Sequence, residues 1–261
     1  MHEYQQPYRD LYESILEYEG SEMYADVVRP WLRGQDGERR WLESFAKRSG
    51  SPVPPETIED RWRLYALSRI VDLLQLSFSP TPVTPESWGT EPVRAAEYAE
   101  FMDFFGLQRV APRPFHPFFH EIVTVESRPG PPAVVSEYWP AYMLGPLLIT
   151  RAGCIVAAGW DREIAEKSTL YWAFARRNRP AEDLSKGWGS NSQWRTAFRR
   201  DYLLDGVFHY NVDARPDYKR DPQDDLDEAE RLELLRFRCF VQCRKNDRDR
   251  WPYDDTWKEA A

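Results

Sequence analysis

Residues 119–126, with the sequence FHEIVTVE, decide the fold class because their pattern has the two-residue period of a β-strand. Successive side chains of a β-strand point to opposite faces, so His120, Ile122 and Thr124 would share one face. The stretch follows a proline-rich run, residues 112–117, after which the hydrophobic period changes from about 3.6 residues to 2. It therefore predicts the first strand of a sheet.

Further strands are expected downstream at residues 133–138, 142–150 and 154–158. Arg151-Ala152-Gly153 is short enough for a hairpin turn, and residues 206–212 predict a short strand that extends the sheet. The sequence thus predicts a central antiparallel sheet of about four to five strands.

Residues 138–160 are long enough to span a bilayer and contain one charge, Arg151. That charge falls near the middle of the segment, and prolines and glycines divide the rest into strand-sized pieces. The segment is therefore interpreted as buried strands, and no membrane contact is expected.

Residues 1–110 have mainly helical spacing. Helices are expected at residues 4–19, at 22–29 with a stop at Pro30, and from 38 to 50. The first should bury Tyr8, Leu11, Tyr12 and Ile15 and leave its glutamates at 13, 17 and 19 outside. Thr57 is a candidate cap for the longest helix, which closes near Phe78. Thr90-Glu91-Pro92 supplies a cap and a first-turn proline for a helix that ends at Gly106.

Helical spacing returns after the sheet, at residues 161–177 and from 224 to 241. The fold class predicted from these patterns is α+β, with C-terminal helices packed on the sheet. We expect one domain of residues 1–261, consisting of a helical portion (1–110), a sheet with a basic, aromatic helix start (115–215), a C-terminal helix (220–245) and a polar tail (246–261).

Composition and charge narrow the class of protein. Hydrophobic residues make up 42% of the 261, enough to fill a core. The net charge of −8 argues against a protein whose whole surface follows nucleic acid or anionic lipid. Three cysteines and no apolar run at the N-terminus suggest a cytoplasmic protein without a signal peptide.

One stretch, residues 186–200, combines glycines, helix caps, indoles and guanidiniums. The two glycines at 187 and 189 precede cap residues, and a helix is expected from about Gln193. The start of a helix is partly positive, yet this one has no acid in its first turn, and Lys186 and Arg195 add further positive charge. From 176 to 200 there are seven Lys or Arg and two acids, a balance of +5.

Two interpretations of this stretch stay open. In the first, it binds a phosphate or carboxylate group, while an indole stacks on an attached ring. The candidate ligand-binding residues are Lys186, Trp188, Ser190, Asn191, Ser192, Trp194, Arg195 and Arg199. In the second, carboxylates of the same chain neutralise the charge; the candidates are Glu137, Glu182, Asp183 and the acidic run 221–230.

Motifs for a definite reaction are absent, and no catalytic residue is assigned. The sequence contains no G-x-x-x-x-G-K-S/T pattern, and Gly187-Trp188-Gly189 does not fit G-x-G-x-x-G, the two glycine patterns that bind phosphates of nucleotides. No cofactor is predicted. Pro117 interrupts the spacing between His116 and His120, so no metal site is predicted there. A Ser190 or Ser192 nucleophile paired with His209 lacks the expected glycine elbow.

Three hypotheses of function follow. The first is an intracellular protein that binds an anionic small molecule at residues 186–199, with enzymatic activity undecided. The second is an acidic interaction protein, of the inhibitor or immunity type, that covers a basic protein partner. The third, single-stranded nucleic-acid binding through residues 176–200, ranks last because most of the molecule would repel the phosphates.

Overall fold

The computed structural model of the protein describes residues 6–80, 92–169, 198–214, 226–243 and 255–261. They fall into two compact units. The first contains the described residues up to Gln108 together with Phe198, and the second contains Arg109 onward and the remainder. Helices and strands are both present, so the predicted α+β class is confirmed. The single domain of residues 1–261 stays a prediction.

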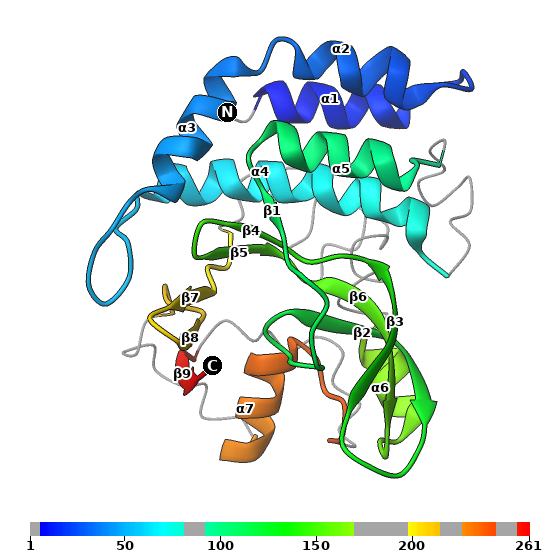
Figure 1. Cartoon of the computed structure of the whole chain (residues 1–261), viewed down its shortest axis with the longest axis vertical. Coiled ribbons are helices and arrows are strands. Elements are labelled where there is room, and N and C mark those ends of the chain that lie inside the picture. The colour runs from blue at the N-terminus through cyan, green and yellow to red at the C-terminus, as the bar shows by residue number, and fades with distance from the viewer. Residues whose placement is uncertain (1–5, 81–91, 170–197, 215–225, 244–254) are drawn as a thin grey trace. The chain divides into compact units, whose positions relative to one another are not determined.

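The first unit is helical (Figure 1). Its elements are α1 (Gln6–Leu16), the π-helix η1 (Tyr24–Val28), α2 (Arg29–Leu32), α3 (Asp36–Ala46), α4 (Ile58–Gln75), the 3-10 turn η2 (Leu76–Phe78) and α5 (Ala95–Phe104).

The first helix shows how the hydrophobic pattern sets the packing of this unit. Four residues three or four positions apart, Tyr8, Leu11, Tyr12 and Ile15, are buried as their spacing predicts. The Tyr8 hydroxyl donates to Glu38 on α3 at 2.9 Å. Burial of that carboxylate is therefore matched by a hydrogen bond from another helix.

Thr57 begins α4 as predicted, because its side chain accepts from the Asp60 backbone N–H and Asp60 accepts from the Thr57 N–H in return. Asp60 also accepts two hydrogen bonds from Arg48, at 2.6 and 3.1 Å. Burial raises the pKa of Asp60, but Arg48 and Thr57 outweigh it and lower that pKa below its ordinary value. The same carboxylate thus caps α4 and ties it to the end of α3.

Two predicted helix boundaries are wrong. The helix expected to stop at Pro30 continues, since Pro30 lies in the first turn of α2, where its missing N–H removes no helical bond. The helix predicted to have Pro92 in its first turn is α5, which begins at Ala95. Pro92 lies outside it. Arg94 occupies the cap position, and its N–H donates to Glu97 at 2.9 Å.

The second unit contains two sheets rather than one meander (Figure 1). The six-stranded sheet has the order β1-β4-β5-β7-β8-β9, and the three-stranded sheet has the order β2-β6-β3. The strands are β1 (Gln108–Arg109), β2 (His120–Ser127), β3 (Ala133–Trp139), β4 (Tyr142–Leu144), β5 (Leu147–Thr150), β6 (Ala152–Ala158), β7 (Tyr202–Leu204), β8 (Val207–Tyr210) and β9 (Trp257–Ala260).

Both the strands and their pairing differ in part from the prediction. The single strand expected at 142–150 is a hairpin of β4 and β5, and β1, β7 and β9 were not expected. β2 pairs with β6 in parallel, and β3 pairs with the other edge of β6. Arg151 is not in a hairpin turn: it joins β5 in one sheet to β6 in the other. Alternation fixes which residues form a strand but leaves the partner of that strand open.

Tight turns join the consecutive antiparallel strands of the larger sheet. Leu144 faces Leu147 across a two-residue turn in which Gly145 has φ +56°. Asp205 and Gly206 both have positive φ, 50° and 74°, and connect β7 to β8. An Asp-Gly pair suits such a turn because both central residues must adopt the left-handed region.

Side chains from both sheets and both helices of this unit fill its core. The three-stranded sheet packs through Ile122, Cys154 and Val156 against Ala165 of α6 (Arg162–Thr169). Phe118, Phe208 and Tyr210 pack with Leu235 of α7 (Glu228–Phe237). The segment tested for a membrane span is thus a set of strands, and among the described helices none is both long and apolar enough to cross a bilayer.

Candidate functional site

Seven of the eight residues predicted to bind an anion fall outside the described residues. Arg199 is described, and its guanidinium is 3% exposed. Its Nε donates to Asp201 Oδ1 at 3.0 Å, and its Nη2 donates to the Leu235 carbonyl at 2.7 Å. The second interpretation of the sequence therefore applies to Arg199: a carboxylate of the same chain neutralises it.

The carboxylate that neutralises Arg199 was not among those proposed from the sequence. Asp201 also accepts from Arg238 Nη2 at 2.7 Å and from the Asn211 backbone N–H at 2.7 Å. Burial raises the pKa of Asp201, but Arg199, Arg238 and the Asn211 N–H outweigh it and lower that pKa below its ordinary value. Asp201 is thus charged in the folded protein and central to a buried network.

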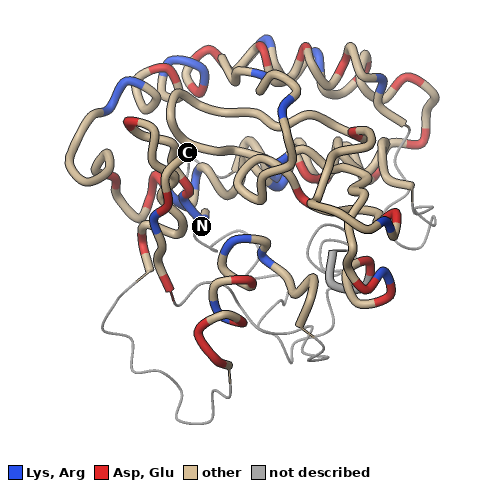
Figure 2. The backbone as a smooth tube through the Cα atoms, turned by 60° about the horizontal axis from the view of Figure 1, so that its bottom comes forward, with Lys and Arg blue, Asp and Glu red and all other residues tan. Residues whose placement is uncertain are grey.

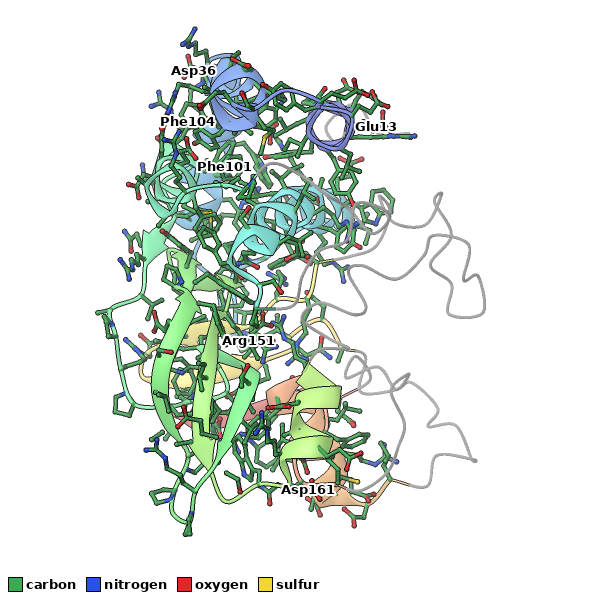
Figure 3. The ribbon with its side chains drawn as sticks, turned by 90° about the vertical axis from the view of Figure 1, so that its right-hand side faces the viewer. Glu13, Asp36, Phe101, Phe104, Arg151 and Asp161 are labelled. Carbon is green, nitrogen blue, oxygen red and sulfur yellow. The ribbon has the colours of Figure 1, made fainter. Side chains whose placement is uncertain are left out.

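A second buried arginine lies at the junction of the two sheets (Figure 3). Arg151 Nη1 donates to the Phe237 carbonyl at 2.9 Å, and Nη2 contacts Glu121 at 3.2 Å. Burial and the charge of Arg238 lower the pKa of Arg151 to about 10. This guanidinium remains charged at neutral pH and is held by the end of a helix.

The end of α7 explains why these guanidiniums gather. The helix is acidic in its first turn and basic at its end (Figure 2). Its last carbonyls have no partners within the helix and carry the negative end of the macrodipole. Arg199 and Arg151 donate to the carbonyls of Leu235 and Phe237, so the cluster closes the helix as a structural brace.

The neighbouring Arg200 is also neutralised within its unit. Its Nε and Nη2 donate to the two oxygens of Asp213 at 2.8 and 2.7 Å, and Nη1 donates to the Tyr202 hydroxyl. A bidentate pair of this kind fixes both side chains. Asp213 therefore orients Arg200.

His116 and His120, the histidines considered for a metal site, both accept hydrogen bonds from backbone N–H groups. His120 is 2% exposed, and its Nδ1 accepts from the His116 N–H at 3.0 Å. Burial lowers the pKa of both rings. Among the described residues, no group of three or more His, Cys, Asp or Glu side chains is arranged to hold a metal ion.

An acidic segment of exposed residues lies on the first unit. From residue 10 to residue 28 there are six acids and no Lys or Arg. All six are exposed, and they form what we call the acidic surface: Asp10, Glu13, Glu17, Glu19, Glu22 and Asp26. Three of these glutamates were expected on the outer face of the first helix, but the segment as a whole was not singled out from the sequence.

Few basic groups of the same unit offset this surface. Glu13 pairs with Arg9 at 2.7 Å on the outer side of α1 (Figure 3). Glu22 lies 3.5 Å from Arg94, and the Asp26 carboxylate accepts from the Tyr18 hydroxyl at 2.6 Å. Exposed pairs of this kind contribute about 0 to 1 kcal/mol and leave the carboxylates accessible.

Comparison with protein-family models, curated proteins and solved structures gives no match.

Proposed function

We propose that this chain is a cytoplasmic interaction protein, of the inhibitor or immunity type, whose acidic surface covers a basic protein partner. The observation that carries the proposal is the run of six exposed carboxylates between residues 10 and 28 without a basic residue. An acidic patch attracts a basic partner during encounter and disfavours other acidic proteins.

Charge reversal on the acidic surface tests this proposal. A Glu17→Lys/Glu19→Lys variant turns two attractions into repulsions and is expected to weaken the complex about tenfold or more. The partner is captured from extracts of the native host, identified and purified. Affinity for the purified partner is then measured by calorimetry at low and moderate salt.

The control is Glu43→Lys/Asp103→Lys, which changes the net charge equally at exposed positions of α3 and α5. This variant should bind within about twofold of the wild type at moderate salt, where distant charges are screened. If both variants weakened binding equally, the net charge of the protein, and not the acidic surface, would explain the loss of affinity. Failure to recover a stoichiometric, salt-sensitive complex would count against the proposal itself.

A second candidate is binding of an anionic small molecule at residues 186–195. It rests on the positive charge that remains in this part of the sequence after Arg199 and Arg200 are paired. Arg199 and Arg200 take their carboxylates from Asp201 and Asp213, which lie beyond residue 200. Setting those two arginines aside, residues 176–200 still hold five basic residues against two acids. The positive balance on which the proposal for Lys186 and Arg195 rests is thus smaller, at +3, but keeps its sign.

Thermal melts in panels of phosphate, nucleotides and carboxylates test this second candidate. A ligand at a hundredfold its Kd should stabilise the folded protein by about 2.7 kcal/mol. We expect Arg195→Ala to abolish that shift and Arg128→Ala, at an exposed arginine of the second unit, to retain it. A wild-type melting temperature that is indifferent to every anion would end this candidate.

A further inference from the structure

The last strand of the chain is held mainly by polar and backbone contacts. β9 pairs with β8 alone, with Glu259 opposite Phe208. Of its four residues, three are exposed, including Trp257 at 40%. The sequence predicts a polar tail for residues 246–261, and β9 lies within it. By contrast, all four residues of β5 are buried.

One side chain of β9, Glu259, is held by groups outside the strand. Its carboxylate accepts from the Tyr210 hydroxyl at 2.6 Å and from Arg236 Nε at 3.1 Å. His116 Nε2 lies 3.6 Å from the same Oε1 atom, close to it but not hydrogen-bonded. We call these three residues, Tyr210, Arg236 and His116, the carboxylate site.

The carboxylate site is positioned by contacts that do not involve β9. The His116 ring stacks on Phe208 with centroids 4.4 Å apart, and its Nδ1 accepts from the Phe118 N–H at 3.2 Å. That bond leaves the ring proton on Nε2, which faces Glu259. Tyr210 belongs to the buried cluster that contains Phe118 and Phe208. The receptor for the carboxylate is therefore formed by the rest of the unit.

The protonation states suit a site that accepts an anion. Burial, followed by the Glu259 carboxylate, raises the pKa of Tyr210, so its hydroxyl keeps its proton. Burial lowers the pKa of His116, so the ring is neutral at physiological pH and its Nε2–H lies toward the carboxylate. Arg236 supplies the single positive charge among the three residues and is 27% exposed. If β9 left, this charge and the edge of β8 would both lose their partner.

We infer that the edge of β8 and the carboxylate site together form a binding site for an extended acidic peptide, which β9 occupies as a displaceable strand of the same chain. The backbone of such a peptide would add to the sheet, and its Glu would enter the carboxylate site. Trp257 and Glu259 lie on the same face of β9 because side chains alternate. The ligand class is thus an extended segment whose backbone pairs with β8 and whose Glu lies at the carboxylate site. This site is independent of the acidic surface.

Peptide binding to a chain that lacks residues 255–261 tests the inference. The probe is a labelled peptide with the sequence DTWKEAA, and the matched probe carries Gln in place of its Glu. Fluorescence anisotropy should show one-to-one binding of the first peptide and at least about tenfold weaker binding of the second. In the truncated chain, Arg236→Gln should weaken the first peptide to the same degree, and Arg128→Gln should leave it unchanged. A folded truncated chain that binds both peptides equally, or neither, overturns the inference.

Hydrogen exchange on the full chain provides a test that does not require the truncated chain to fold. The β9 amides should exchange at least about tenfold faster than those of β5, because a displaceable strand opens more often than a core strand. Excess DTWKEAA peptide should increase exchange in β9, and the Gln peptide should not. Protection of β9 equal to that of β5, with no response to the peptide, would contradict displacement.

Discussion

Replacing Asp201 by Asn is expected to lower the free energy of unfolding by about 3 to 5 kcal/mol. The side chain is 3% exposed and neutralises Arg199 and Arg238. An amide of the same shape removes the charge but leaves two guanidiniums beside it, one of them almost fully buried. Urea denaturation monitored by circular dichroism measures the change.

The effect of Asp201 should also depend on pH. Because its folded-state pKa lies below the ordinary value of about 4, folding favours the charged carboxylate. Its contribution is complete above that ordinary pKa and is lost as the pH falls through the lower folded-state pKa. The difference in stability between wild type and Asp201→Asn should therefore be constant near neutral pH and shrink in acid.

Asp205 provides the matched control. It lies in the β7–β8 turn with φ +50°, and it is exposed. Asparagine tolerates that backbone conformation, so Asp205→Asn should stay within about 0.5 kcal/mol of wild type. Similar losses in the two variants, or a pH-independent loss at Asp201, would mean that Asp201 does not hold the buried network together.

The Arg199–Asp201 pair shows what the sequence could and could not predict about the candidate site. Residues two apart in extended chain share a face, so this counter-charge was available from spacing alone. The other partners were not, since Arg238 and the Leu235 carbonyl come from the end of a helix more than thirty residues away. The balance of +5 over residues 176–200 therefore overestimates the charge left for a ligand, because it counts Arg199 and Arg200 without Asp201 and Asp213.

The predictions of the fold show the same contrast between features set by nearby residues and features set by distant ones. The buried face of α1 and the Thr57 cap depend on residues within one or two turns, and both predictions are confirmed. The parallel pairing of β2 with β6 depends on segments about thirty residues apart, which periodicity does not rank. The Asp205-Gly206 pair is a local sequence signal for the β7–β8 hairpin. No neighbouring residue indicates the role of Glu259, because Tyr210 and Arg236 are distant in sequence.

Gly153→Ala is the second substitution with a large expected effect, about 3 kcal/mol of destabilisation. Gly153 pairs with Trp139 between β6 and β3. A Cβ atom built on Gly153 would lie 2.2 Å from Cζ2 of the Trp139 ring. That indole is 1% exposed, and its N–H donates to the Arg151 carbonyl at 3.0 Å, so it has little room to move. Thermal and urea denaturation measure the loss.

Gly159→Ala is the control, because the nearest atom to its added Cβ is the Arg128 carbonyl oxygen at 3.7 Å, an ordinary contact. It should stay within about 1 kcal/mol of wild type. A double-mutant cycle then assigns the cost of Gly153→Ala to the indole. In a Trp139→Phe background the smaller ring leaves space, and the cost should fall by about 1 to 2 kcal/mol. An undiminished cost would place the strain in the β6 backbone rather than in the contact with Trp139, and the indole would then no longer explain why glycine occupies this position.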